Sequence, residues 1–317
     1  MNSTHERPGK LSTGIAGLIM AISGASLWGI SGTVASFLFI DYGFPFTTLV
    51  SMRMLIAGFI LLVLWRPMFP SVKRSLFLFY SIVGMFGVQL TYLAAIYYSN
   101  APTATLLQYL FLPIIMIYET FLGKIKFSRI ILLSLFLSLY GTFELITGFP
   151  FHSSPIILNP YAIFFGLMSA IEAFLYIILS GPLIKKNGTV PVITWAFLIG
   201  GLFSLIFSVS PSYSYFTSVT FSRLLLIISL VLIVAIGGTL IAFGLYLRSL
   251  RYIKATQTSL AGTVEPISAA VTSAIILGIF LTELQYIGGL LILGSIIIMQ
   301  LFSKKVFLSD EAEITVN

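Results

Sequence analysis

The sequence contains no cysteine, only two histidines and few charged residues. Without cysteine the chain can form neither a disulfide bond nor a thiolate centre. Asp, Glu, Lys and Arg make up 9% of the 317 residues, whereas soluble domains carry about 25%. Hydrophobic residues make up 58% of the chain, and the mean hydropathy is +1.06. This composition excludes a water-soluble surface and predicts an integral membrane protein, for which lipid is the outer solvent.

The motifs of several enzyme and nucleotide-binding classes are also missing. His5 and His152 are far apart, so the sequence offers no His-Glu-x-x-His metal helix. There is no Gly-x-Ser-x-Gly nucleophile elbow, no Walker loop and no dinucleotide fingerprint. The formal charge of +7 comes from basic residues between apolar runs, which indicates membrane topology rather than nucleic-acid binding. We therefore predict that the chain is not an enzyme and has no metal site, cofactor or nucleic-acid partner.

Ten apolar runs occupy most of the chain, each close to the roughly 20 residues that a transmembrane helix requires. They are continuous, without the period-two alternation of barrel strands. The first run has no convincing cleavage site, so it is expected to remain as a span. The predicted spans are Ile15–Phe39, Phe46–Trp65, Leu76–Tyr98, Thr103–Leu122, Ile130–Thr147, Tyr161–Leu183, Val192–Val209, Leu224–Leu247, Thr256–Leu277 and Leu284–Phe302. The predicted fold class is an all-α polytopic membrane protein with ten transmembrane helices.

The basic residues alternate with these spans. With a cytoplasmic N-terminus, all but two of the 17 Lys and Arg residues fall on the cytoplasmic side. The exceptions are Arg223, at an outer boundary, and Arg53, inside the second span. The positive-inside rule therefore predicts that both tails, residues 1–11 and 304–317, lie in the cytoplasm. We expect a multi-pass protein of a bacterial cytoplasmic membrane.

The two halves of the chain resemble each other. The segment Gly17–Ile22 matches Gly166–Ile171, 149 positions later, and Pro102–Pro113 matches Ala255–Pro266, 153 positions later. Each half holds five spans, an odd number, so the second half must cross the membrane in the opposite sense. This predicts two inverted five-helix repeats, residues 12–150 and 151–303, an architecture frequent among secondary transporters.

A set of residues follows a fixed order along the two halves, namely Trp28-Gly29, Arg53, Pro113, Ala255-Thr256, Glu265-Pro266, Gln285 and Gly288-Gly289. In this order the chain resembles the EamA-type group of the drug/metabolite transporter superfamily. Members of that group often have a Gly-Glu pair at the ends of spans four and nine, where this chain has Gly123-Lys124 and Gly278-Ile279. The resemblance implies transport of small organic solutes through a central cavity formed by spans one, three, four, six, eight and nine.

Two acids lie inside predicted spans and are candidates for binding substrate or a coupling ion. An ionised carboxylate inside a membrane is costly unless it is paired or hydrated. Glu172 shares one helical face with Ser169, Tyr176 and Ser180 in span six. Glu172, like Glu265 in span nine, could instead be a structural, hydrogen-bonded carboxyl group.

Glu265 directly precedes a proline in span nine. Pro266 cannot donate to the Gly262 carbonyl, which we expect to be free to orient a substrate or bind a cation. The matching Pro113 of span four frees the Tyr109 carbonyl, but Leu112 stands where the acid would be. The two halves are therefore chemically unequal.

Arg53 lies about two helical turns below the outer surface of its predicted span. It could extend to that surface, pair with an acid or bind a substrate carboxylate. The other candidates to line a cavity are aromatic or amide side chains within spans, namely Trp28, Gln89, Tyr92, Gln108, Tyr109 and Tyr176.

The sequence thus predicts a secondary active transporter of small organic metabolites, with amino acids one possible class. We expect an exporter coupled to protons or another ion, with Glu172, Glu265 and Arg53 as candidate coupling residues. A passive channel or facilitator and a lipid scramblase remain alternatives, because a polar groove through the membrane would carry the same residues.

Overall fold

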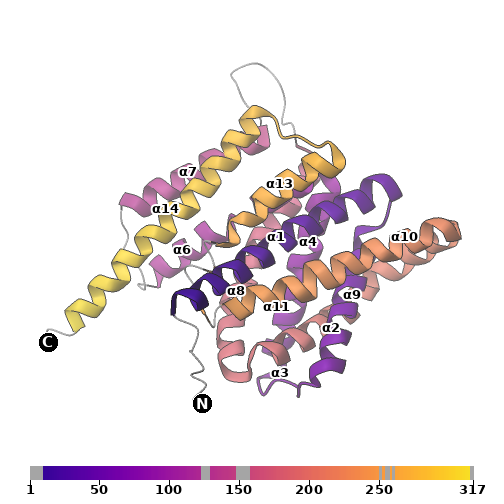
Figure 1. Cartoon of the computed structure of the whole chain (residues 1–317), viewed down its shortest axis with the longest axis horizontal. Coiled ribbons are helices and arrows are strands. Elements are labelled where there is room, and N and C mark those ends of the chain that lie inside the picture. The colour runs from indigo at the N-terminus through magenta and orange to yellow at the C-terminus, as the bar shows by residue number, and fades with distance from the viewer. Residues whose placement is uncertain are drawn as a thin grey trace, which may run out of the picture.

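The computed structural model of the chain describes residues 10–122, 129–147, 158–249, 252–253, 258 and 261–314. Within these ranges all regular structure is helical and no strand occurs. Figure 1 shows long helices packed side by side into one bundle, with α14 carrying the C-terminus away from its edge. This confirms the prediction of an all-α fold.

The helices of the first half run from Lys10 to Thr147. They are α1 (Lys10–Tyr42), α2 (Phe46–Trp65), α3 (Arg74–Phe79), the π-helix η1 (Tyr80–Phe86), α4 (Gly87–Tyr98), α5 (Ala101–Gln108), α6 (Phe111–Phe121) and α7 (Arg129–Thr147). The second half contains α8 (Pro160–Asn187), α9 (Thr189–Ser218), α10 (Phe221–Leu232), the π-helix η2 (Ile233–Ile241), α11 (Ala242–Ser249), α13 (Val264–Leu277) and α14 (Glu283–Ile314).

Six of the helical stretches are long and apolar enough to cross a membrane, and four shorter apolar helices correspond to the remaining predicted spans. The described residues thus contain ten apolar helices, a count consistent with the predicted polytopic membrane protein. The start of predicted span nine, at Thr256, lies outside the described residues. Large apolar side chains such as Phe59, Ile206 and Phe221 are exposed on the bundle. Such surfaces suit a chain whose outer solvent is lipid.

Both halves carry the same two irregularities. Their third spans contain the π-helices η1 and η2, and their fourth spans are interrupted three residues before a proline. The first interruption, at Tyr109 and Leu110, precedes Pro113, and the second, at Thr263, precedes Pro266. A proline removes one backbone hydrogen bond and clashes with the carbonyl four residues earlier, so both breaks fall where the sequence demands them.

The two halves meet along paired helices, α2 with α9 and α7 with α14, and their close approaches are reciprocal. A Cβ added to Gly141 would lie 2.6 Å from the Gly288 carbonyl oxygen, and a Cβ on Gly288 would lie 2.6 Å from that of Gly141. Likewise, Gly58 of α2 contacts Leu198 of α9, and Gly201 of α9 contacts Leu55 of α2. Glycine permits this backbone contact between membrane helices.

Hydroxyl groups join the helices that carry the candidate site. Ser51 of α2, two residues before Arg53, hydrogen-bonds Ser208 of α9 at 2.7 Å. Thr33 of α1 lies 2.7 Å from Thr272 and 3.0 Å from Ser273, both on α13. Interhelical hydrogen bonds of this kind hold membrane helices in register. They fix the positions of α2 and α13 on either side of the bundle interior.

Candidate functional site: a cavity between the two repeats

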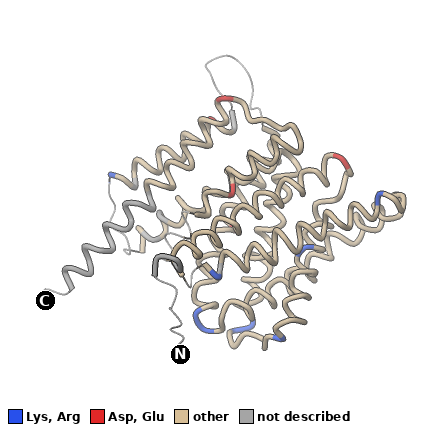
Figure 2. The backbone as a smooth tube through the Cα atoms, in the orientation of Figure 1, with Lys and Arg blue, Asp and Glu red and all other residues tan. Residues whose placement is uncertain are grey.

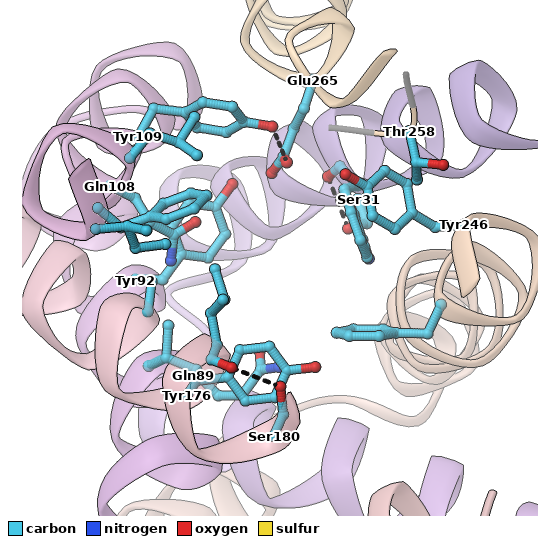
Figure 3. Close-up of a pocket in the computed structure, with 18 of the residues that line it drawn as sticks. Ser31, Gln89, Tyr92, Gln108, Tyr109, Tyr176, Ser180, Tyr246, Thr258 and Glu265 are labelled. Carbon is cyan, nitrogen blue, oxygen red and sulfur yellow. Dashed lines mark hydrogen bonds between the residues drawn. The ribbon is translucent and has the colours of Figure 1, made fainter. Parts of the chain in front are cut away.

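The bundle encloses a cavity of about 480 Å³, within the range of small-molecule sites. Its walls come from α1, α2, α4, α5 and α6 of the first repeat and from α8, α11 and α13 of the second. All but one of the predicted site residues line it: Trp28, Arg53, Gln89, Tyr92, Gln108, Tyr109, Tyr176 and Glu265. Figure 3 shows Tyr109 and Glu265 on one side of the space, Gln89 and Tyr176 on another, and Tyr246 facing across it. Span two, which the family resemblance did not include, contributes Arg53.

Glu265 occupies the first turn of α13 and is only 7% exposed. Its Oε2 atom lies 3.0 Å from the hydroxyl oxygen of Tyr109. The same hydroxyl donates to the Gly262 carbonyl at 2.6 Å. The Gly262 carbonyl, which Pro266 frees, therefore already accepts a hydrogen bond from the protein. The prediction that it stays free for a substrate or cation is corrected by this contact. The Tyr109 carbonyl, freed by Pro113, accepts the backbone N–H of Leu112 at 3.1 Å.

Arg53 is buried at 4% exposure and does not extend to the surface. Its Nε atom donates to Thr239 Oγ1 on the π-helix η2 at 3.1 Å. Among the described residues it forms no ion pair with a carboxylate, although Glu265 interacts with it electrostatically and lines the same cavity. A buried guanidinium needs an anionic or hydrogen-bonding partner to offset its desolvation. Arg53 also lines the cavity, in which a ligand could supply such a partner.

Trp28 packs its ring against Phe243 and Tyr246, with centroid distances of 4.9 and 4.8 Å. This packing requires α1 and α11 to lie close, and Gly24 permits it, because a Cβ there would be 2.8 Å from the Ala242 carbonyl oxygen. The indole Nε1 atom is buried without a hydrogen-bond partner in the described part of the chain. A buried donor left unpaired costs about 1–3 kcal/mol.

The remaining predicted residues hold the walls in place. Tyr92 of α4 contacts the Thr105 hydroxyl of α5 at 2.9 Å, which joins the third and fourth spans. Tyr176 of α8 stacks on Tyr80 of η1 with ring centroids 5.9 Å apart. Gln89 is almost fully buried in the wall. These side chains present hydroxyl and amide groups to a cavity whose surface is otherwise mostly apolar.

Glu172 is the predicted site residue that does not line the cavity. It is partly buried in the seam between α8 and α4, where Thr91 Oγ1 lies 2.5 Å from its Oε2 atom. Gly87 makes room for the carboxyl group, because a Cβ there would be 2.6 Å from Oε1. The polar stripe predicted for span six is thus divided: Tyr176 and Ser180 face the cavity, and Glu172 faces the seam.

The sequence did not predict several of the lining residues, notably Ser31, Phe243 and Tyr246. Phe243 and Tyr246 are three positions apart and share one helical face of span eight, which is a usable signal. Thr239, the partner of Arg53, has no such signal, because its direction depends on the π-helix that carries it.

Comparison with known proteins agrees with this architecture. The EamA-like transporter family matches the chain twice, over residues 15–147 and 160–301. A relative from Salmonella typhimurium (strain LT2), which carries the name "uncharacterized inner membrane transporter YicL", is 34% identical over 300 residues, covering 91% of this chain and 96% of the relative. One solved crystal structure, 17% identical over 95% of this chain and 99% of its own, has a TM-score of 0.50 and shares the fold.

Proposed function

Because this chain belongs to the EamA-like transporter family and is a multi-pass membrane transporter, we propose that its cavity carries small organic metabolites by proton-coupled secondary export. The observation that carries the proposal is the pairing, in one cavity, of a buried carboxyl group with a buried guanidinium that has no carboxylate ion-pair partner in the described part of the chain. Amino acids are the first substrate class to test.

The chemistry of the cavity supports a zwitterionic substrate. The guanidinium of Arg53 has the planar fork that suits a carboxylate, and Trp28, which also lines the cavity, carries an indole Nε1 atom without a partner among the described residues. Glu265 offers oxygen atoms to an ammonium group, and the neighbouring tyrosine rings can add cation–π attraction. Aliphatic walls, including Leu112, Ile115 and Ile177, suit an apolar side chain between the two poles.

Glu265 is the better candidate for the coupling acid because it shares the cavity with the proposed substrate. Coupling requires that protonation favour one orientation of the cavity over the other. A proton and a substrate ammonium would compete for the same carboxyl oxygens, so binding of one disfavours the other. Glu172, which lies in the helix seam, is the second candidate.

We further propose that the two repeats, residues 12–150 and 151–303, are inverted, with the tails 1–11 and 304–317 in the cytoplasm. The reciprocal contacts of Gly141 with Gly288 support a two-fold relation between repeats. Figure 2 shows Lys and Arg mainly along the lower side of the bundle, with Asp and Glu above them, which supports the assigned orientation. The name of the Salmonella relative supports a bacterial inner membrane.

The test is ligand-induced stabilisation of the purified protein, followed by flux measurements in proteoliposomes. Leucine should raise the apparent stability, by about 2.7 kcal/mol at a hundredfold excess over its dissociation constant. Isoamylamine, which lacks the carboxylate, and 4-methylpentanoate, which lacks the ammonium, should each stabilise the protein less. Leucine efflux should then depend on an imposed proton gradient. Flux that ignores the gradient would indicate a facilitator, and lipid flux without solute flux would indicate a scramblase.

A further inference from the structure

One phenol joins the two helix breaks of the molecule. Tyr109 lies at the break between α5 and α6, and Gly262 lies at the break before α13. The two residues occupy matching positions of the two repeats, 153 positions apart. The Tyr109 hydroxyl contacts the Gly262 carbonyl at 2.6 Å and Glu265 Oε2 at 3.0 Å. A single hydroxyl group thereby links span four, in the first repeat, to span nine, in the second.

The number of hydrogens available for these two contacts depends on whether Glu265 is ionised or neutral. A tyrosine hydroxyl donates one hydrogen, a backbone carbonyl can only accept, and an ionised carboxylate can also only accept. With an ionised Glu265, the Tyr109 proton must choose between two acceptors, and one of the two short contacts is left without a hydrogen. With a neutral Glu265, the carboxyl donates to Tyr109 and Tyr109 donates to Gly262. Only the neutral form satisfies both contacts fully.

The surroundings of Glu265 give the ionised form a different partner. The titratable or charged groups that interact with it are Arg53 from α2, Tyr92 from α4 and Tyr109 from the α5–α6 break. Tyr246 from α11 lies beside Gly262 and interacts with Tyr109. The helix α1 presents Gly29, which contacts the Glu265 backbone carbonyl. Arg53 is the only formal cation among these described groups, so an ionised carboxylate is attracted away from Tyr109 and toward α2.

We propose that Tyr109 is a positioning residue for the proton of Glu265: the neutral acid completes a Glu265–Tyr109–Gly262 chain that ties α13 to the α5–α6 break, and release of the proton to cavity water leaves this chain one hydrogen short, which weakens the tie and lets the carboxylate move toward Arg53. The role of this proton as the coupling ion rests on the proposed function, whereas the tie itself does not. The first repeat has no equivalent, because Leu112 stands at the position matching Glu265. Only one of the two broken helices is therefore controlled by a proton.

Infrared spectroscopy of the reconstituted protein tests the hydrogen bond directly. The C=O stretch of a protonated Glu265 is isolated as the wild type minus Glu265→Gln difference. In Tyr109→Phe the carboxyl loses its acceptor, so this band should move to higher frequency. Tyr215→Phe is the matched control, because the Tyr215 hydroxyl also donates to a backbone carbonyl of another helix, that of Tyr42 at 2.9 Å, with no acid involved. An unshifted band in Tyr109→Phe would overturn the proposal.

Spin-label distances test the mechanical consequence, and the absence of native cysteine makes the labelling specific. Labels at Ile117→Cys on α6 and Ile267→Cys on α13 occupy exposed positions outside the cavity. The wild-type distance distribution should change with pH. Glu265→Gln should keep the low-pH distribution at every pH, because an amide still donates to Tyr109, and Tyr109→Phe should keep the high-pH distribution.

The two variants are expected to fail in opposite directions, which a general loss of folding cannot produce. A Tyr109→Phe variant that responds to pH as the wild type does would contradict the tie. A tie that behaves as expected in a protein whose flux ignores proton gradients would leave the positioning role of Tyr109 intact and contradict only the proposed coupling.

Discussion

Glu265 and Glu172 are two intramembrane acids with nearly the same local chemistry and different surroundings. Each carboxyl group lies beside one hydroxyl that also contacts a backbone carbonyl: Tyr109 with Gly262 in one case, and Thr91 with Gly87, at 3.0 Å, in the other. Glu265 faces the cavity and Arg53, whereas Glu172 fills a seam between two helices. The contrast indicates that access to a cavity and to a countercharge, rather than the hydroxyl beside it, distinguishes a candidate coupling acid from a packing acid.

The largest expected difference between the two regions concerns coupling. Glu265→Gln should abolish proton-driven flux while retaining substrate exchange without a gradient, because the amide keeps size and hydrogen bonding but cannot ionise. Glu172→Gln, the matched control, should keep the wild-type dependence on the gradient. Flux assays in proteoliposomes, with and without an imposed pH difference, measure both. The reverse outcome would assign coupling to the seam, and unchanged behaviour of both variants would make both acids structural.

The next effect concerns Arg53, the cation that lines the same cavity as Glu265. Arg53→Gln removes a charge-assisted interaction with the substrate carboxylate, worth about 1.5–3 kcal/mol. Leucine binding should weaken roughly tenfold to a hundredfold, whereas isoamylamine binding should be unaffected or improve. Arg53→Lys should restore only part of the affinity, because lysine lacks the planar fork. Equal weakening for both ligands would show that Arg53 maintains the fold rather than contacting the carboxylate. Thermal-shift titrations provide the readout.

The seam around Glu172 should respond in stability rather than in transport. Gly87→Ala places a methyl group 2.6 Å from the Glu172 carboxyl, so this side chain must rotate away and lose its contact with Thr91, at a cost of about 1–3 kcal/mol. Gly84→Ala is the control on the same side of the span, because its Cβ would meet its nearest neighbour at an ordinary 3.5 Å. Denaturation in detergent compares the two variants. A Gly87→Ala protein as stable as Gly84→Ala would mean that the seam is loose.

The smallest effect on leucine binding is expected at the indole of Trp28, which lines the cavity. Trp28→Phe keeps the ring packing against Phe243 and Tyr246 but removes the unpaired Nε1–H donor. If the substrate accepts from this donor, leucine binding should weaken by about 1 kcal/mol, while the unliganded protein should be as stable as the wild type or slightly more so. A stability loss without a change in affinity would assign Trp28 to packing.

Much of the architecture could be predicted from the sequence, because the membrane limits the possibilities. Length and hydropathy define ten helices, and Pro113 and Pro266 locate the two breaks through local backbone chemistry alone. Polar residues inside apolar helices tend to face the interior, which explains why eight of the predicted side chains line the cavity.

What the sequence could not provide depends on tertiary contacts. Helical periodicity places Glu172 and Tyr176 on one face, but that face is wide enough to contact both a seam and a cavity. The occupation of the Gly262 carbonyl by Tyr109 joins residues more than 150 positions apart, and no local pattern encodes it. The bond from Arg53 to Thr239 depends in turn on a π-helix, whose widened turn redirects the side chains it carries.

The reciprocal glycine contact between α7 and α14 has an evolutionary consequence. Gly141 and Gly288 each meet the other's backbone carbonyl in the same way, so the surface they share is complementary to itself. Such a surface can be formed by two identical chains as readily as by two halves of one chain. A single five-helix ancestor could therefore have assembled as a dimer through this contact, and fusion of two copies would have required no new interface. The later divergence could then concentrate on the cavity, where Leu112 and Glu265 now differ.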